Sequence, residues 1–171
     1  ESIPQVYKIF GPGNQYVTCA KQLINKEGVA IDMPAGPSEV AVIADETCVP
    51  AFVAADLLSQ AEHGADSQVI LVSNSEIVIK KVNEELELQL KALSRNTIAE
   101  KALQNSKAIL VNSLEEGMEL LNEYASEHLI IACSNADELA EKVVNAGSVF
   151  IGNYSCESAG DYASGTNHTL P

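Results

Sequence analysis

The feature that most constrains the fold is an alternation between short apolar runs and longer stretches of helical period. The runs are continuously apolar, as strands buried on both faces are, and do not alternate apolar with polar residues. They predict strands at 29–31, 40–44, 69–72, 108–111, 129–132 and 148–151. The alternation predicts a doubly wound α/β fold, with a mostly parallel sheet and helices on both faces.

Four helices are expected between the later strands. One begins near Pro50, and a second begins at Ser75. A third opens at Ser113, which forms a capping box with Glu116 three residues later. A fourth is predicted over residues 135–146.

The chain falls into three predicted regions. Residues 1–36 hold only one β-α-β unit, which leaves apolar surface unpaired, so they are interpreted as the end of a neighbouring α/β domain. A rigid break at 34–37, Pro-Ala-Gly-Pro, separates them from an α/β core over 37–151. Residues 152–171 are rich in Gly, Ser, Asn and Tyr and lack apolar period, and their polar content favours an active-site loop.

Composition narrows the classes of partner. The 171 residues, 46% of them hydrophobic, are enough to bury a sizeable core. The net charge of −14 and the lack of any basic run argue against nucleic acid as a partner. No segment approaches the ~20 apolar residues of a membrane span, and the N-terminus does not resemble a signal peptide. Four cysteines without CxxC spacing indicate reduced thiols, and a cytoplasmic protein is expected.

Gln60 and His63 are the first candidates for chemistry. They lie three residues apart at the predicted end of the helix that begins near Pro50, so their side chains share a face. An amide oxygen and an imidazole nitrogen there would supply half of a zinc site. A histidine before a helix-ending Gly64 also has a purely structural explanation, and the local residues alone favour it.

Glu127 and His128 are the second candidates. An adjacent carboxylate and imidazole offer two bases that titrate in different ranges. They precede a predicted strand, whereas ligands of doubly wound sheets bind at the carboxyl ends of strands. A functional pair is therefore less expected here unless this strand runs antiparallel to its neighbours, and a surface pair remains an equal alternative.

The most informative segment is 157–168. It is punctuated by glycine and carries Asp, Ser, Thr, Asn and His, which suit a binding site and have no packing purpose. Ser38 is similar, because rigid turns place its hydroxyl just before a strand. It can equally cap its own loop.

Several of these segments together resemble the histidinol dehydrogenase family in order and spacing. The resemblance covers essentially the whole chain and is carried by residues 11–14, 30–39, 56–64, 126–129 and 157–168. It implies that the chain is the central part of a longer enzyme with an incomplete Rossmann-like fold, and that residues 1–36 belong to its dinucleotide-side domain.

The resemblance also implies an activity, L-histidinol oxidised through L-histidinal to L-histidine with reduction of two NAD, in a zinc-containing homodimer of histidine biosynthesis. Gln60, His63 and Asp161 match zinc ligands, Glu127 the residue that activates water, and His128 the general base. Asn14 matches a dinucleotide contact. The implied substrate contacts are Ser38, Gln60, His63, His128, Asp161 and His168.

Two departures from the family pattern leave alternatives open. The family's fourth zinc ligand is a histidine of a C-terminal tail that reaches in from the partner subunit, and no such residue follows Asp161 in the expected place before Pro171. The family's N-terminal segment, which supplies further dinucleotide contacts and the rest of both domains, is also absent, and no GxGxxG fingerprint is present. The 171 residues alone are therefore expected to be inactive, and one alternative is a folded but catalytically silent dimerisation module. A phosphate-binding regulatory domain is a weaker alternative, because the glycines at 11–13 lack a nearby basic residue.

Overall fold

The computed structural model describes residues 4–11, 14–32, 34 and 39–160. The chain divides into two compact units, with a boundary between residues 36 and 37. The units are described separately below.

The smaller unit is one β-α-β motif, as its sequence predicts. Strand β1 (Lys8–Ile9) pairs in parallel with β2 (Ala30–Ile31), and helix α1 (Gln15–Lys26) connects them. Asn14 caps α1, because its Oδ1 accepts hydrogen bonds from the backbone N–H groups of Tyr16 and Val17, at 3.1 and 3.2 Å.

A buried lysine ties the three elements of this unit together. Lys21 of α1 is 7% exposed and forms an ion pair with Asp32, just after β2. Its Nζ also donates to the carbonyl oxygen of Gly11, whose own N–H donates to Asp32 Oδ2 at 2.9 Å. The hydrogen bonds from Lys21 and Gly11 hold the pKa of the Asp32 carboxyl below its ordinary value.

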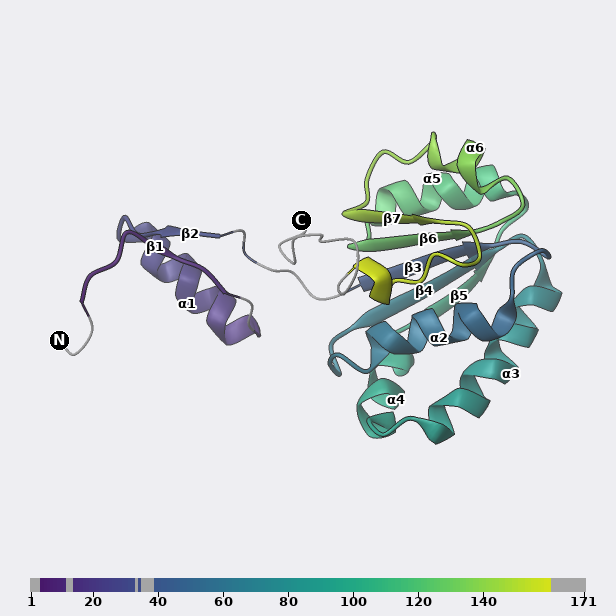
Figure 1. The fold of residues 1–171 in the computed structure, drawn as a ribbon, viewed down its shortest axis with the longest axis horizontal. Coiled ribbons are helices and arrows are strands. Elements are labelled where there is room, and N and C mark those ends of the chain that lie inside the picture. Colours follow the sequence, from purple (N-terminus) through teal and green to yellow (C-terminus); the bar gives the residue numbers. More distant parts are fainter. Residues whose placement is uncertain (1–3, 12–13, 33, 35–38, 161–171) are drawn as a thin grey trace. The chain divides into compact units, whose positions relative to one another are not determined.

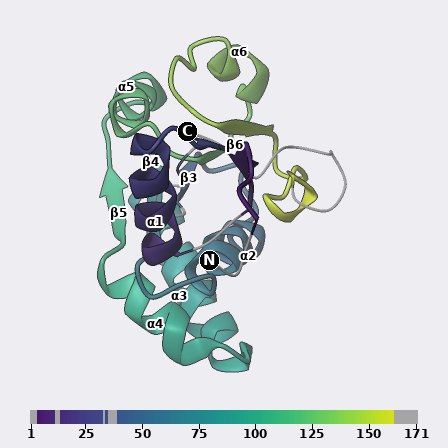
Figure 2. The same ribbon diagram turned by 90° about the vertical axis from the view of Figure 1, so that its left-hand side faces the viewer.

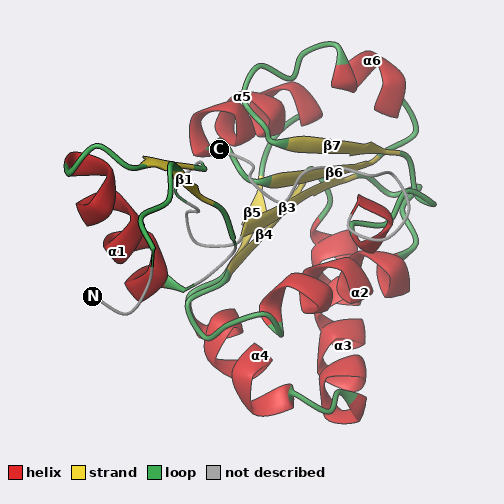
Figure 3. Ribbon diagram, turned by 60° about the vertical axis from the view of Figure 1, so that its left-hand side comes forward, coloured by secondary structure: helices red, strands yellow, loops and turns green. Residues whose placement is uncertain are grey.

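The larger unit contains a five-stranded parallel sheet (Figures 1 and 3). Its strands stand in the order β5-β4-β3-β6-β7, so the order reverses between β3 and β6, as in doubly wound folds. The predicted strands are confirmed to within one residue at each end. The strands are β3 (Glu39–Ala44), β4 (Gln68–Ser73), β5 (Lys107–Leu110), β6 (His128–Ala132) and β7 (Ser148–Ile151).

Helices cover both faces of this sheet, as predicted (Figure 2). One face carries α2 (Pro50–Ala61), α3 (Glu76–Ala92) and α4 (Asn96–Gln104), and the other carries α5 (Leu114–Tyr124) and α6 (Ala136–Ala140). Alternate strand residues enter the two cores, because Val40 and Val42 pack beneath α2 while Ala41 and Ile43 pack beneath α5. None of the described helices is long and apolar enough to cross a membrane.

Two helices differ from the prediction. Helix α4 was not predicted. The helix expected over 135–146 ends at Ala140, because the side chain of Asn122 binds the following backbone: its Nδ2 donates to the carbonyl oxygen of Lys142, and its Oδ1 accepts from Val144 N–H at 2.7 Å. These bonds hold the segment in turns and replace the helical hydrogen bonds that the sequence pattern suggested.

The capping box is present in modified form. Ser113 Oγ accepts from the Glu116 N–H at 3.2 Å, as expected. The Glu116 carboxylate reaches one residue further back than predicted and accepts from the backbone and side chain of Asn112, at 2.8 and 2.9 Å. The cysteines also follow expectation in part: all four are free, Cys48 and Cys133 are buried, and Cys19 and Cys156 are exposed.

Candidate active site

The candidate residues gather at the amino edge of the parallel sheet, which is the side on which its strands begin; the strands end at the carboxyl edge. His128 is the first residue of β6, and Glu39 is the first residue of β3. Strand β6 runs parallel to both of its neighbours, so the antiparallel direction that would have favoured a functional Glu127-His128 pair is not found. His128 thus lies on the side of the sheet where helix α2 ends and to which the segment after β7 returns (Figure 1).

His128 is buried and oriented by two contacts. The residue is 8% exposed, and its Nε2 lies 3.8 Å from Oε1 of Glu157. Its ring meets the Phe150 ring edge to face, with 5.9 Å between the centroids. The other ring nitrogen, Nδ1, is buried and has no hydrogen-bond partner among the described residues. The imidazole is thus fixed in place with one nitrogen uncommitted.

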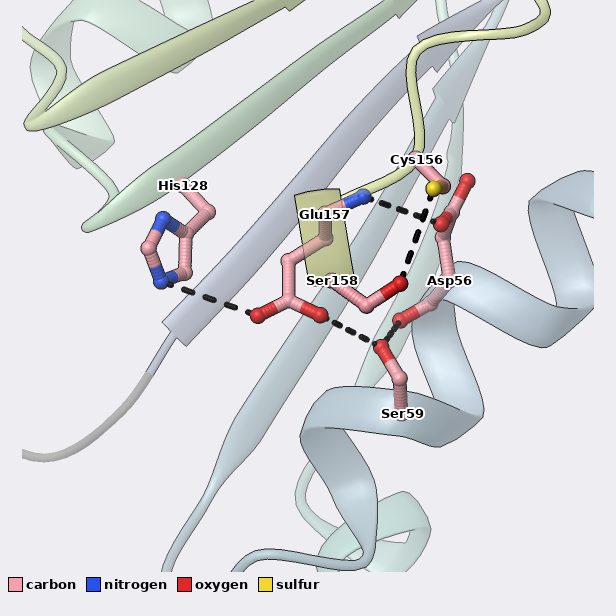
Figure 4. A network of polar contacts seen from close by, with 6 residues as sticks. All are labelled: Asp56, Ser59, His128, Cys156, Glu157 and Ser158. Atoms are coloured by element: carbon pink, nitrogen blue, oxygen red, sulfur yellow. Dashed lines mark hydrogen bonds and ion pairs between the residues drawn. The ribbon is translucent and has the colours of Figure 1, made fainter. Parts of the chain in front are cut away.

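Glu157 links His128 to helix α2 (Figure 4). This carboxylate is 3% exposed, and its Oε2 accepts a hydrogen bond from Ser59 Oγ at 2.8 Å. Its backbone N–H donates to Asp56 Oδ1 at 3.2 Å. A carboxylate from the segment after β7 therefore stands between the first residue of β6 and the side chains of α2.

Asp56 is perturbed by this position. Burial is the largest cause that raises the pKa of its carboxyl, and the negative charge of Glu157 raises it further. The hydrogen bond from the Glu157 N–H acts in the opposite direction, and the pKa is about 6. Two acidic groups in one partly desolvated place are typical of functional sites.

Glu127 lies among a second set of polar groups. Burial, and then the charge of Glu127, raise the pKa of Glu39 above its ordinary value. Burial, and then the charge of Glu39, likewise raise the pKa of Tyr124, whose hydroxyl donates to Gln68 Oε1 at 2.8 Å. Glu127 and His128 are adjacent in sequence but have different surroundings. Glu39 lies near Glu127, whereas Glu157 and Phe150 lie against His128.

Two of the three side chains expected to bind zinc, Gln60 and His63, are among the described residues. Helix α2 ends at Ala61 and not at Gly64, so His63 lies in the turn beyond it, and the expectation of a shared helical face is wrong. His63 is exposed, whereas Gln60 is 1% exposed and its Nε2 has no partner among the described residues. Amide nitrogen and oxygen are interchangeable by a flip, so this buried unpaired amide fits an oxygen donor to a cation.

Three predicted site residues, Ser38, Asp161 and His168, lie outside the described residues. In the part of the chain that is described, no cluster of three His, Cys, Asp or Glu side chains is placed to hold a metal. Asn14, the expected dinucleotide contact, uses its Oδ1 to cap α1. Only its Nδ2 group therefore remains to donate to a dinucleotide.

At the opposite, carboxyl edge of the sheet, side-chain hydrogen bonds join the ends of β3 and β6, the two strands between which the strand order reverses. Asp45, directly after β3, accepts hydrogen bonds at Oδ2 from the N–H and hydroxyl of Ser134, which follows β6, at 3.0 and 2.9 Å. Its Oδ1 accepts from Thr47. Burial alone would raise the pKa of Asp45, but the bonds from Ser134 and Thr47 outweigh it and hold the pKa below its ordinary value.

Sequence reasoning did not assign roles to Glu157, Ser59 and Asp56. Asp56 and Ser59 share a helical face by their spacing of three, a signal visible in the sequence. Their partner is 98 residues beyond Ser59 along the chain. A contact at that separation could not be recognised from local pattern.

Known proteins match this chain along its whole length. The profile of the histidinol dehydrogenase family matches residues 1–171. A histidinol dehydrogenase of Bacteroides fragilis strain YCH46 is 67% identical, and one of Bacteroides thetaiotaomicron is 64% identical, each over 171 residues. Each alignment covers all of this chain and 40% of the relative.

Solved structures give the same result. The crystal structure of histidinol dehydrogenase from Elizabethkingia anophelis is 60% identical, with a TM-score of 0.95, and covers 100% of this chain and 40% of that one. A gamma-glutamyl phosphate reductase from Thermotoga maritima, 13% identical over 84% of this chain with a TM-score of 0.54, shares the fold alone. The chain belongs to the histidinol dehydrogenase family.

Proposed function

We propose that this chain is part of an enzyme that oxidises L-histidinol through L-histidinal to L-histidine, with reduction of two NAD. Family membership supports the proposal, although the chain spans about two fifths of the length of the relatives it matches. The observation that carries it is the buried His128, which Glu157 orients and Ser59 of α2 supports through Glu157. The buried amide of Gln60 lies on the same helix, next to Ser59 in the sequence.

His128 serves as the general base. An alcohol becomes an aldehyde when its hydroxyl loses a proton and its carbon loses a hydride. An imidazole titrates near neutrality and is suited to take that proton. The burial of His128 and its edge-to-face contact with Phe150 keep the ring still, which lowers the entropic cost of the transfer.

Glu127 serves the second oxidation. The aldehyde must first gain a water, and the carboxylate of Glu127 accepts the proton of that water. Glu39 lies near enough for the charge of Glu127 to raise the pKa of its carboxyl, after the larger effect of burial, so the two carboxyls share one electrostatic environment. The water step and the alcohol step thus use two different bases.

Zinc and NAD are the proposed cofactors: zinc supplies positive charge that holds the nitrogen atoms of the substrate, and NAD supplies the hydride acceptor. Gln60, His63 and Asp161 would hold the metal, and the unpaired buried amide of Gln60 fits that role. Asn14 would contact the dinucleotide through its Nδ2. Ser38 and His168 would contact the substrate, and the full-length enzyme would be a homodimer.

The deciding experiment supplies L-histidinol and L-histidinal separately to a full-length histidinol dehydrogenase that carries this sequence, and follows NADH. We expect two NADH per L-histidine from histidinol. Glu127→Gln should slow the oxidation of histidinal by about 10²- to 10⁴-fold and that of histidinol much less. Equal losses on both substrates would assign Glu127 a shared or structural role, and no NADH from the wild type would refute the function.

The zinc ligands have an independent test. His63→Ala and Asp161→Ala in the same enzyme should each lose zinc on dialysis, as measured by elemental analysis. Asp66→Ala, an exposed carboxylate in the turn after His63, is the matched control and should keep its zinc. Unchanged zinc content in both ligand variants would remove these residues from the metal site.

The 171 residues by themselves are proposed to fold without catalysing the reaction. The chain covers 40% of the relatives it matches, and the other segments of a full-length enzyme are proposed to complete the zinc and dinucleotide sites. Incubation of the chain with zinc, NAD and histidinol should give no NADH above background. Turnover within tenfold of a full-length enzyme would show that no other segment is needed.

A further inference from the structure

Glu157 is an unusual residue to find in the interior. An ionised carboxylate that leaves water loses several kcal/mol of hydration unless nearby groups compensate. Glu157 is 3% exposed, yet it belongs to no strand or long helix and fills no apolar core. Its burial therefore requires a reason other than packing.

Its partners indicate what the reason is. Among the described residues, the one side chain within 4.0 Å of the carboxylate that can become a cation is His128. Ser59 lies on the other carboxylate oxygen, at 2.8 Å. The arrangement aims a fixed negative charge at the ring of the proposed base (Figure 4).

Helix α2 holds this carboxylate from two sides. The Ser59 hydroxyl also lies 2.8 Å from the carbonyl oxygen of Asp56, but it has a single hydrogen to donate. The charged acceptor makes the stronger bond, which favours Glu157. The Asp56 carboxyl meanwhile accepts from the Glu157 backbone N–H, so both the main chain and the side chain of Glu157 are anchored.

We propose that Glu157 is a positioning residue for His128, which fixes the imidazole and offsets the positive charge that the ring acquires on accepting a proton. The inference rests on the proposed function. In the alcohol step the hydroxyl proton moves to the His128 ring, and the hydride with its electron pair moves to the nicotinamide. The ring becomes imidazolium beside the Glu157 carboxylate, and it returns to neutral imidazole when the proton passes to water.

The kinetic test compares Glu157→Gln, which keeps the shape and loses the charge, with Glu157→Asp, which keeps the charge. In a full-length enzyme, kcat for histidinol should fall on the order of 10²-fold in Glu157→Gln. KM and zinc content should stay within twofold. Glu157→Asp should recover part of the loss, and Ser59→Ala should lose less than Glu157→Gln because it leaves the charge in place.

A titration of the ring decides the question without reference to activity. The protein is labelled with ¹⁵N-histidine, and His128 is assigned by comparison with His128→Asn. The midpoint of its ring titration should lie lower in Glu157→Gln than in the wild type, because an opposite charge is lost. The other carboxyls of this edge, Asp56, Glu39 and Glu127, remain in both proteins.

The outcomes separate the two proposals. A wild type that does not oxidise histidinol counts against the proposed function, while the ring titration still tests the contact between Glu157 and His128. An unchanged titration midpoint in Glu157→Gln overturns the inference. A raised KM with unchanged kcat also overturns it, because the carboxylate would then bind substrate.

Discussion

The two edges of the larger sheet differ in how their polar groups are satisfied. At the carboxyl edge, hydrogen bonds from Ser134 and Thr47 overcome the burial of Asp45 and hold the pKa of its carboxyl low. At the amino edge, burial and the nearby charge of Glu157 raise the pKa of Asp56 to about 6. A carboxylate is stabilised at one edge and destabilised at the other.

Unpaired atoms show the same contrast in a different form. At the amino edge the described residues leave a ring nitrogen of His128, an amide nitrogen of Gln60 and the hydroxyl of Ser126 buried without partners. At the carboxyl edge, the buried atoms without partners in the described part of the chain are the amide oxygens of Asn135 and Asn153. Buried polar groups are normally paired, so unpaired donors and bases mark the place where a ligand is expected. In this sheet that place is the edge that doubly wound folds usually leave unused.

The largest effect is expected from His128 itself. His128→Asn in a full-length enzyme removes the proposed base, so kcat for histidinol should fall by about 10²- to 10⁴-fold. The steady-state rate of NADH formation measures it. Asp45→Asn, at the other edge, should leave kcat per folded enzyme unchanged. Similar losses in both variants would erase the functional contrast between the edges.

Asp45 should matter for stability. Asn at this position places an amide NH₂ where Ser134 or Thr47 now donates, which leaves a buried donor unpaired and costs about 1.5–3 kcal/mol. Urea unfolding of the 171-residue chain at pH 7 measures the loss. Because the folded pKa of Asp45 is lowered, the stability it provides is present above its ordinary pKa of 3.8 and is lost as pH falls below it. A loss that does not shrink in acid would mean that the charge of Asp45 is not stabilising.

The ionisation of Asp56 should have the opposite effect on folding stability from that of Asp45. Its folded pKa of about 6 lies above its ordinary value of 3.8, so ionisation destabilises the fold as pH rises through this window. The difference between these two pKa values corresponds to about 3 kcal/mol of folding free energy, which solvent screening at this half-buried position reduces to about 1–2 kcal/mol. Asp56→Asn, compared with wild type in urea, should therefore gain that amount between pH 4 and pH 7. A constant difference over this range would contradict the raised pKa.

The sequence predicts the sheet well because its cause is local. Each strand is a continuous apolar run, and burial on both faces follows directly from that pattern. The length of helix α6 was overestimated, because its end depends on Asn122, which lies in a different helix. Local pattern therefore identifies elements, while their ends depend on tertiary partners.

The candidate site could be predicted only in part. His128 and Gln60 were found through residue type and family resemblance, and the structure places both at the amino edge. The direction of β6 could not be predicted from its residues, and the strand is parallel to both of its neighbours. At the carboxyl edge, which doubly wound folds usually use, Asp45 is bonded to Ser134. Glu157 was missed because its importance comes from contacts with distant residues and from its burial, neither of which a sequence displays.

Hydrogen exchange of a full-length enzyme with and without zinc and L-histidinol tests the central claim most directly. The amides of residues 57–61, 126–129 and 156–160, at the amino edge, should exchange more slowly when the ligands are bound. The amides of 45–48 and 133–136, at the carboxyl edge, should exchange at unchanged rates. Protection confined to the carboxyl edge would show that the substrate binds at the usual place in a doubly wound sheet, and that the site described at the amino edge is wrong.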